Sequence, residues 1–586
     1  MLELLKKLKK RECFLILVCV VFIVAQVWLD LKVPDYMSEI TQLVETEGSK
    51  MTDILKNGGF MVLCAFGSLI SAVIVGYIAS FVAATFSKVV RKDIFSKVES
   101  FSSGEVKKFS TSSLITRATN DVTQVQMLLA MGMQLLIKSP IMAVWAIMKI
   151  LNKGWQWSLL TAGAVAILVT TILILMSIVL PRFKRVQKLI DNINDITREN
   201  LTGIRVVRAF NAEKYQEDKF SKANDNLTNN QLFNQRAMQV LSPMMNLVMY
   251  GLTLGIYFIG AYLLDAALMS EKLTIFGNMV VFSSYAMQVI MSFVMLIMIF
   301  IMYPRAAVSA RRINEVLDEP LSILDGEIVE NQTGLQGTVE FKNVSFQYPD
   351  AESPMLHDIS FKIEKGQTLA IIGSTGCGKT TLIQLIPRLF DTTSGDVFVN
   401  GVNVKDYNLD YLHNIIGYIP QKAVMFSGSV KFNVGFGEPK QEITEEKIKE
   451  AIKVAQGKDF VEKMSKKYDA PISQGGTNVS GGQKQRLAIA RAIARDPEIY
   501  IFDDSFSALD YKTDAVLRNE LKKYTKDATS IIVAQRIGTI INADKIIVLD
   551  NGKCVGIGTH KELLKKCKVY QEIALSQLSK EELENA

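Results

Sequence analysis

Histidine is scarce in this chain, and its cysteines do not cluster. The 586 residues include three histidines and six cysteines, and no two cysteines have the short spacing that zinc sites require. We therefore expect no metal site built from histidine and cysteine. The cysteines, expected to be reduced structural thiols, are Cys13, Cys19, Cys64, Cys377, Cys554 and Cys567.

We also expect neither a cleavable leader nor a basic patch for nucleic acid. Lysine and arginine are frequent at residues 6–11, but no small-residue cleavage site follows the apolar stretch after them. The formal net charge is +7, yet the basic residues gather at the ends of apolar segments, as in membrane proteins. We predict a cytoplasmic amino terminus, a retained first span and no nucleic-acid partner.

Long apolar segments dominate the first half of the chain. Hydrophobic residues make up 49% of the sequence, and six segments approach or exceed the roughly 20 apolar residues that cross a bilayer. The predicted spans are 13–35, 57–87, 124–151, 157–180, 238–265 and 273–303. The basic connections should be cytoplasmic, so both termini are predicted to lie inside. An acidic stretch at about 30–56 is predicted to be the first outer loop.

Two long polar stretches, 88–123 and 181–237, follow the second and fourth predicted spans. They lack strong helix breakers, so the spans should continue as helices well into the cytoplasm. The tips at 110–117 and 204–210 carry apolar residues such as Phe210, which are usually covered in folded proteins. We predict that both tips dock onto a cytoplasmic domain.

A second domain follows a polar linker. Beyond the linker, short β-rich runs alternate with amphipathic helices, which is typical of α/β domains. The predicted organisation is a six-span domain at 1–305, the linker at 306–336, an α/β domain at 337–575 and a polar tail at 576–586.

A phosphate-binding loop stands at the start of the α/β domain. The pattern G-x-x-x-x-G-K-T follows an apolar strand at 369–372 and opens a helix, which is the context that such loops need. Lys379 is expected to pair with the β and γ oxygens of ATP, and Thr380 and Asp503 to hold Mg²⁺. The expected loop contacts are Gly373, Ser374, Thr375, Gly376, Cys377, Gly378, Lys379, Thr380 and Thr381. The fold class is thus a multidomain membrane protein, with an all-α six-helix membrane domain fused to an α/β P-loop domain.

A Ser-Gly-Gly-Gln turn precedes a later helix and could offer backbone donors to an anion. Its residues are Ser480, Gly481, Gly482 and Gln483. With the phosphate loop and Asp503, the turn resembles the signature of the ATP-binding cassette (ABC) family, and six spans ahead of one cassette is the layout of an exporter half. The resemblance implies that Tyr348 stacks on adenine, that Gln421 approaches Mg²⁺ and that Asp510 lies at a dimer interface. It also implies that each ATP is enclosed between one chain's phosphate loop and the other chain's turn.

Two positions depart from the family pattern. Asp504 stands where similar proteins carry a glutamate base, and aspartate is shorter by one methylene, about 1.5 Å. Gln535 stands at the position of a histidine, and its amide cannot carry a proton charge. The chain therefore resembles the degenerate half of heterodimeric bacterial multidrug exporters, embedded among lipids of the cytoplasmic membrane. The partner half is expected to carry the glutamate and the histidine.

The last predicted span carries a stripe of methionines. Met287, Met291, Met295 and Met298 recur at helical spacing on one face, and thioethers suit a path for varied amphiphilic substrates. Packing against other helices or lipid is the alternative. Lys138 in the third span is either a substrate-site charge or a side chain that reaches the cytoplasmic interface.

Two other functions stay open at this point. A homodimeric exporter of lipids, peptides or drugs would need Asp504 to work as the base. An ATP-gated membrane sensor or channel would use ATP occupancy as a signal without pumping.

Overall fold

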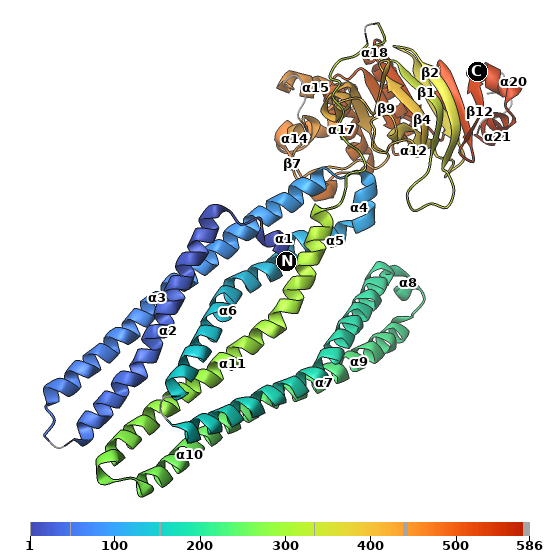
Figure 1. The fold of residues 1–586 in the computed structure, drawn as a ribbon. Coiled ribbons are helices and arrows are strands. Elements are labelled where there is room, and N and C mark those ends of the chain that lie inside the picture. Colours follow the sequence, from blue (N-terminus) through green and yellow to red (C-terminus); the bar gives the residue numbers. More distant parts are fainter. Residues whose placement is uncertain (1, 47, 152–153, 333, 438–442, 578–586) are drawn as a thin grey trace. The chain divides into compact units, whose positions relative to one another are not determined.

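The computed structural model describes residues 2–46, 48–151, 154–332, 334–437 and 443–577 (Figure 1). The chain divides into two compact units. Unit 1 comprises Met1–Lys97 and Ser112–Glu319, and unit 2 comprises Val98–Thr111 and Pro320–Ala586. Unit 1 is built from helices and unit 2 is an α/β domain, in agreement with the predicted fold class.

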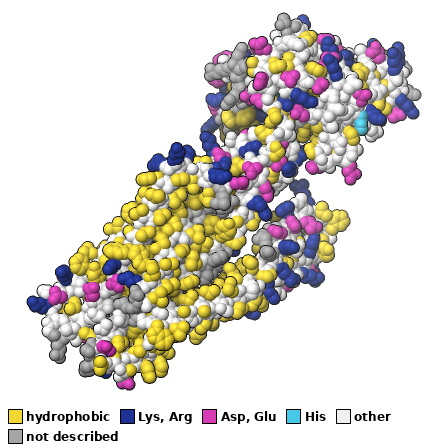
Figure 2. Space-filling model, viewed as in Figure 1, with side chains coloured by type: hydrophobic (Ala, Val, Ile, Leu, Met, Phe, Trp, Pro, Cys, Tyr) yellow, Lys and Arg dark blue, Asp and Glu magenta, His cyan; other side chains and the backbone are white. Residues whose placement is uncertain are grey.

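The helices of unit 1 include six segments that are long and apolar enough to cross a membrane. They confirm the six predicted spans, and hydrophobic side chains cover much of their visible face (Figure 2). The elements are α1 (Leu2–Leu5), α2 (Lys10–Glu45), α3 (Met51–Glu99), α5 (Thr111–Thr116), the π-helix η1 (Arg117–Asp121), α6 (Val122–Leu151), α7 (Trp155–Thr202), α8 (Ile204–Ala209), α9 (Glu213–Gln239), α10 (Leu241–Ala266) and α11 (Met269–Leu317).

The predicted outer loop at 30–56 was wrong over most of its length, because α2 and α3 continue through it. Two of the acidic residues that led to this prediction are paired within the helical bundle. Asp30 lies 3.1 Å from the Nζ of Lys138, and Asp35 lies 2.7 Å from the Nζ of Lys149. Both pairs join α2 to α6, so the carboxylates need no aqueous loop to neutralise them.

The helices α7 and α9 form a long hairpin with α8 at its tip (Figure 1). The tip is the predicted docking segment 204–210, and most of its apolar side chains are uncovered in this chain, although Val207 is buried. Val206 is 61% exposed and Phe210 is 78% exposed.

Of the other predicted docking segment, 110–117, only residues 110 and 111 belong to unit 2. The residues that join unit 2 are Val98–Thr111, which include the short helix α4 (Ser103–Phe109). Glu105 of this helix is 5% exposed. It accepts hydrogen bonds from the backbone N–H groups of Ser102 (2.7 Å) and Ser322 (2.8 Å). Glu105 thus connects α4 to the beginning of the second part of unit 2.

Replacing Glu105 by glutamine should destabilise unit 2 in a pH-dependent way. Burial opposes ionisation of this carboxyl, but hydrogen bonds from Ser102 and Ser322 outweigh burial and lower the pKa of Glu105 to about 2. A lowered pKa stabilises the fold above the ordinary value of 4.5, and the contribution is lost as the pH falls through about 2. At pH 7 we expect Glu105→Gln to reduce the free energy of unfolding by about 1–2 kcal/mol. Thermal melts at several pH values test this.

The matched control for that substitution is Glu99→Gln, because Glu99 is exposed at the end of α3. It should leave the melting temperature unchanged across the same pH range. An equal effect of both substitutions, or a Glu105 effect that does not shrink below pH 4.5, would contradict the assignment.

Unit 2 contains two main sheets. The first is antiparallel, in the order β2-β1-β4-β5, and the second has the order β12-β11-β3-β10-β9-β6 with only β12 antiparallel to its neighbour among the described strands. The strands are β1 (Val339–Phe346), β2 (Leu356–Ile363), β3 (Thr368–Gly373), β4 (Ser394–Val399), β5 (Val402–Asn403), β6 (Ile416–Ile419), β7 (Gly428–Ser429), β8 (Pro471–Ile472), β9 (Ile499–Asp503), β10 (Thr529–Val533), β11 (Lys545–Asp550) and β12 (Lys553–Gly558).

Helices surround these strands. They are α12 (Lys379–Gln384), α13 (Leu409–Ile415), α14 (Val430–Val434), α15 (Glu445–Val454), α16 (Lys458–Glu462), α17 (Gly481–Ala494), α18 (Tyr511–Tyr524), α19 (Ile537–Ile540), α20 (His560–Lys566) and α21 (Lys568–Gln577), with 3₁₀ turns η2 (Lys467–Asp469) and η3 (Gln474–Gly476). The strands β3, β6, β9 and β10 are neighbours and parallel, so the loops that follow them meet at one edge of the sheet.

The structure modifies the predicted linker at 306–336. Its first residues belong to α11, which continues to Leu317. The predicted tail at 576–586 begins within α21, and residues 578–586 lie outside the described part of the chain.

Candidate nucleotide site

The phosphate loop runs from the end of β3 to the start of α12. Gly378 caps α12 at φ +97°, and a Cβ there would lie 2.7 Å from the Cδ2 of Leu356, so this position requires glycine. The Nζ of Lys379 donates to the carbonyl oxygens of Gly373 (2.8 Å) and Ser374 (2.7 Å). The ammonium is therefore held inside the loop, where a phosphate would meet it.

Two oxygen ligands converge beside the loop. The Oγ1 of Thr380 donates to Oδ1 of Asp503 at 2.9 Å, and the hydroxyl of Tyr418 donates to Oδ2 at 3.3 Å. Asp503 is 2% exposed, and burial raises the pKa of its carboxyl. A hydroxyl and a carboxylate fit Mg²⁺, which takes few protein ligands and completes its shell with phosphate and water. Among the described residues, no group of three or more His, Cys, Asp or Glu could hold another kind of metal.

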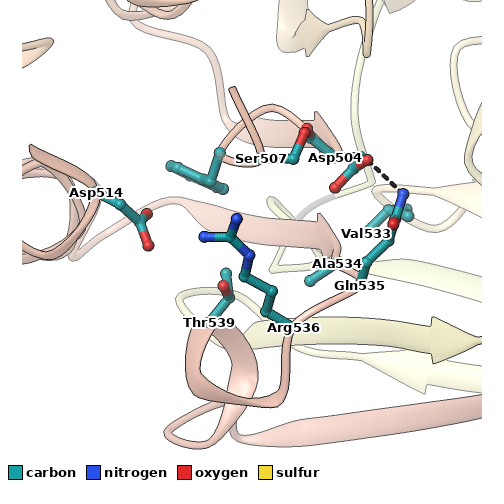
Figure 3. Close-up of a pocket in the computed structure, with 9 residues that line it drawn as sticks. Asp504, Ser507, Asp514, Val533, Ala534, Gln535, Arg536 and Thr539 are labelled. Carbon is teal, nitrogen blue, oxygen red and sulfur yellow. Dashed lines mark hydrogen bonds between the residues drawn. The ribbon is translucent and has the colours of Figure 1, made fainter. Parts of the chain in front are cut away.

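Asp504 follows β9 in the left-handed region, at φ +48°. Its Oδ2 accepts one hydrogen bond from the Nε2 of Gln535 (2.7 Å, Figure 3) and another from the Nε2 of Gln421 (3.2 Å). Two neutral amides therefore occupy the same carboxylate oxygen. Asp504 and Gln535 also line an adjoining pocket of about 240 Å³ with Arg536 and Asp514 (Figure 3).

Most of the predicted nucleotide contacts line one open pocket of about 260 Å³. These are Tyr348, Thr375, Gly376, Gly378, Lys379, Thr380, Thr381, Gln421, Asp503, Asp504 and Gln535. Gly373, Ser374 and Cys377 belong to the same loop without lining the pocket. The Ser480–Gln483 turn and Asp510 do not line it.

The Ser480–Gln483 turn opens α17 as a capping box. The Oγ of Ser480 accepts from the backbone N–H of Gln483 (3.3 Å), and the Oε1 of Gln483 accepts from the backbone N–H of Ser480 (2.9 Å). A Cβ on Gly481 would meet no atom within 4 Å. Because N–H groups of a first helical turn have no partner inside the helix, the turn is ready to receive an anion from outside. Asp510 caps α18 through the backbone N–H of Thr513 (3.0 Å), which lowers the pKa of Asp510.

Some site residues escaped the sequence interpretation. The Nζ of Lys107 on α4 lies 4.9 Å from the ring centroid of Tyr348 and 5.8 Å from that of Phe390. The Tyr348 hydroxyl also forms a hydrogen bond of 2.9 Å with Thr381. No sequence pattern points to Lys107, because its contact depends on how α4 packs. Tyr418 could have been found, because it lies on the strand that leads to Gln421.

Comparison with known proteins agrees with this geometry. Residues 16–293 match the family of the ABC transporter transmembrane region, and residues 356–507 match the ABC transporter family. An uncharacterized ABC transporter ATP-binding protein of Mycobacterium bovis is 40% identical over 521 residues, covering 89% of this chain and 87% of that protein. This chain is an ABC transporter. It fuses the membrane and ATP-binding domains of a half-transporter, and it is a transport ATPase.

Other relatives support the same assignment. The uncharacterized ABC transporter ATP-binding protein YfiB of Bacillus subtilis is 35% identical and covers 86% of both chains. A Staphylococcus aureus protein, provisionally named a multidrug export ATP-binding/permease protein, is 31% identical over 83% of this chain and 82% of its own. A bacterial Atm1-family ABC exporter with ATP bound has a TM-score of 0.76 at 22% identity, covering 97% of this chain and 99% of that chain. The ABC transporter described here therefore has the exporter fold.

Proposed function

We propose that this ABC transporter chain is one half of a heterodimeric exporter. It keeps ATP at its own phosphate loop with little turnover, and its Ser480–Gln483 turn completes the hydrolytic site of the partner. The observation that carries this proposal is the environment of Asp504, whose Oδ2 accepts from the amides of both Gln421 and Gln535.

The hydrogen bonds to Asp504 limit it as a general base. A base must come within about 2.6–3.2 Å of the attacking water, and the two amides that bond Oδ2 fix the orientation of the Asp504 carboxylate. The side chain is also about 1.5 Å shorter than glutamate. Gln535 can donate a hydrogen bond to a phosphate, but it stays neutral and cannot balance developing charge as a protonated histidine would.

The same site retains what ATP binding needs. Lys379 would bind the phosphates, Tyr348 would stack on adenine, and Mg²⁺ would be held by Thr380, Gln421 and Asp503. This ion would neutralise phosphate charge. Binding is thus preserved while the hydrolytic groups are altered.

The need for a partner follows from the arrangement of unit 2 and of the α7–α9 hairpin. The Ser480–Gln483 turn does not line the phosphate pocket of its own chain, so a second cassette must supply the facing turn. The exposed apolar tip at α8 likewise needs a surface to cover it. The partner half would carry a glutamate and a histidine at the positions of Asp504 and Gln535, in a bacterial cytoplasmic membrane with both termini inside.

The proposed cargo is an amphiphilic small molecule, including drugs. The multidrug name of the Staphylococcus aureus relative supports this class. So does the methionine stripe, because Met291 is 43% exposed and Met298 is 59% exposed on α11, while Met287 and Met295 are partly covered. Flexible thioethers adapt to differently shaped apolar ligands.

The experiment compares ATPase activity of the purified chain alone with that of the chain co-expressed with a half-transporter from the neighbouring reading frame. We expect negligible activity alone and robust activity of the pair, with Lys379→Met as the control for background binding. Robust activity of the chain alone, lost in Asp504→Asn, would establish the homodimeric alternative instead. ATP binding by the pair without transport into vesicles would favour a sensor or channel.

Substitution of Lys107 should strengthen ATP binding at this chain's site. Its ammonium lies over the ring of Tyr348, which a stacked adenine would have to cover. Moving the ammonium away costs about 0.5–1 kcal/mol at an exposed site, so Lys107→Met should lower the Kd for ATP by about two- to fivefold. Displacement of a fluorescent ATP analogue measures the change. Lys108→Met on the same helix is the control, and weaker binding by Lys107→Met would mean that the ammonium assists adenine.

A further inference from the structure

A charged cluster lies among the membrane helices of unit 1. The Nζ of Lys138 on α6 is 3.1 Å from Oδ2 of Asp30 on α2, and the hydroxyl of Ser68 on α3 donates to Oδ1 of Asp30. Both charged side chains are 25% exposed, so a ligand can reach them. Charges at membrane depth are costly and usually mark a substrate or ion path.

A polar group beside this pair lacks a donor. Gln288 on α11 donates through Nε2 to the backbone oxygen of Asp30 at 3.4 Å. Its Oε1 is buried and has no hydrogen-bond partner among the described residues. A buried acceptor without a donor is unfavourable, and a ligand that brings an N–H or O–H group would relieve it.

The methionine stripe continues from this polar group. Met291, Met295 and Met298 follow Gln288 by three, seven and ten positions, which places all four on one side of α11. The stretch from Gln288 to Met298 is about 15 Å long in a helix. The polar group Gln288 and the apolar methionine stripe thus follow one another along α11, an arrangement that suits the head group and the tail of an amphiphile.

We propose that Asp30, Lys138 and Gln288 form a head-group site for a zwitterionic amphiphile whose alkyl chain lies along the methionines. A singly charged head group would take one member of the ion pair and leave the other unpaired in a medium of low polarity, which is strongly unfavourable. A head group with both charges satisfies Asp30 with its cation and Lys138 with its anion. The proposal rests on the proposed export function, because the occupant would be cargo.

The other ion pair between the same helices has a different character. Asp35 receives the Nζ of Lys149 at 2.7 Å and the hydroxyl of Tyr285 at 2.5 Å, and Lys32 lies 3.9 Å away. Tyr285 is completely buried. Its hydroxyl fixes the Asp35 pair in the bundle, so this pair serves as a structural control with the same chemistry.

The test measures binding to the full-length chain, with its co-purified partner where present, in nanodiscs without nucleotide. The probes share one brominated acyl chain and differ in head group: lysophosphatidylcholine (zwitterionic), lysophosphatidylglycerol (anionic) and an acylcholine (cationic). Quenching of the chain's tryptophan fluorescence by the bromine reports binding. We expect the zwitterion to bind at least about tenfold tighter than the other two.

The decisive result is a change of charge preference. Lys138→Met leaves Asp30 alone and should shift the preference by at least about tenfold towards the cationic probe. Asp30→Leu should shift it by a similar factor towards the anionic probe. The control variants Lys149→Met and Asp35→Leu should keep the zwitterionic preference, and the double variant Asp30→Leu/Lys138→Met should lose it without a large loss of thermal stability.

Unchanged preference in the Asp30 and Lys138 variants would overturn the proposal and make the pair a structural link only. Equal binding of all three probes by the wild type would overturn it as well. Because no ATP turnover is involved, failure of the heterodimer or of transport would not alter these binding results, so the two proposals fail separately.

Discussion

Gly481→Asp should abolish ATP hydrolysis by the complete transporter, whereas Asp504→Asn should change it by less than about twofold. The asymmetry follows from the two different sites that these residues serve. Gly481 opens α17, where a carboxylate would repel the γ-phosphate bound to the partner and obstruct the backbone donors. Loss of such donors costs about 100- to 1000-fold in rate. Under the proposed division of labour, Asp504 belongs to the site with little turnover, so loss of its charge should have little effect on the rate.

The measurement is steady-state ATPase of the co-expressed pair in nanodiscs, with ATP binding as the internal control. Gly481→Asp should leave ATP binding to this chain's own phosphate loop unchanged, because the turn does not line that pocket. Equal losses of hydrolysis in both variants would mean that the two sites are equivalent and would contradict the division of labour.

The double substitution Asp504→Glu/Gln535→His should create ATPase activity in the chain purified alone, where a second copy of the chain would supply the facing Ser480–Gln483 turn. Glutamate restores the reach of the carboxylate, and histidine can carry a positive charge near the γ-phosphate. It also removes the Gln535 amide from Oδ2 of the base, where it now bonds at 2.7 Å. General-base catalysis contributes about 100- to 10,000-fold, so a gain of at least about tenfold over wild type is expected.

Each single substitution should recover less than the double, because the two groups act on one reaction. Lys379→Met added to the double variant should return the rate to background. A double variant that binds ATP and forms dimers but shows no gain would show that the low turnover does not originate at Asp504 and Gln535.

The sequence predicted those features that depend on short patterns. Six apolar segments identify spans because the bilayer sets their length, and the phosphate loop is recognisable because glycine, lysine and threonine must stand at fixed spacing. The loop residues and Asp503 and Asp504 meet because they follow or end β3 and β9, two parallel strands of one sheet that both pair with β10. Each of these predictions needed only local chemistry and a knowledge of parallel sheets.

Long-range pairing could not be read in the same way. Asp30 and Asp35 look like loop residues until Lys138 and Lys149 are found opposite them on another helix. Lys138 was a single charge with two interpretations, and the sequence did not indicate its ion pair with Asp30. The contact of Lys107 with Tyr348 depends on how α4 packs, which no periodicity encodes.

The exposed tip of the α7–α9 hairpin should affect the amount of each half-transporter chain that persists in the cell. Under the proposed pairing and membrane orientation, a chain made without its partner would present Val206 and Phe210 to the cytoplasm at the end of a long helical arm. Uncovered apolar side chains on such an arm attract chaperones and proteases, so surplus chains would be removed while paired ones persist. The tip would then act as a stoichiometric check, matching the amount of this half to the amount of the other.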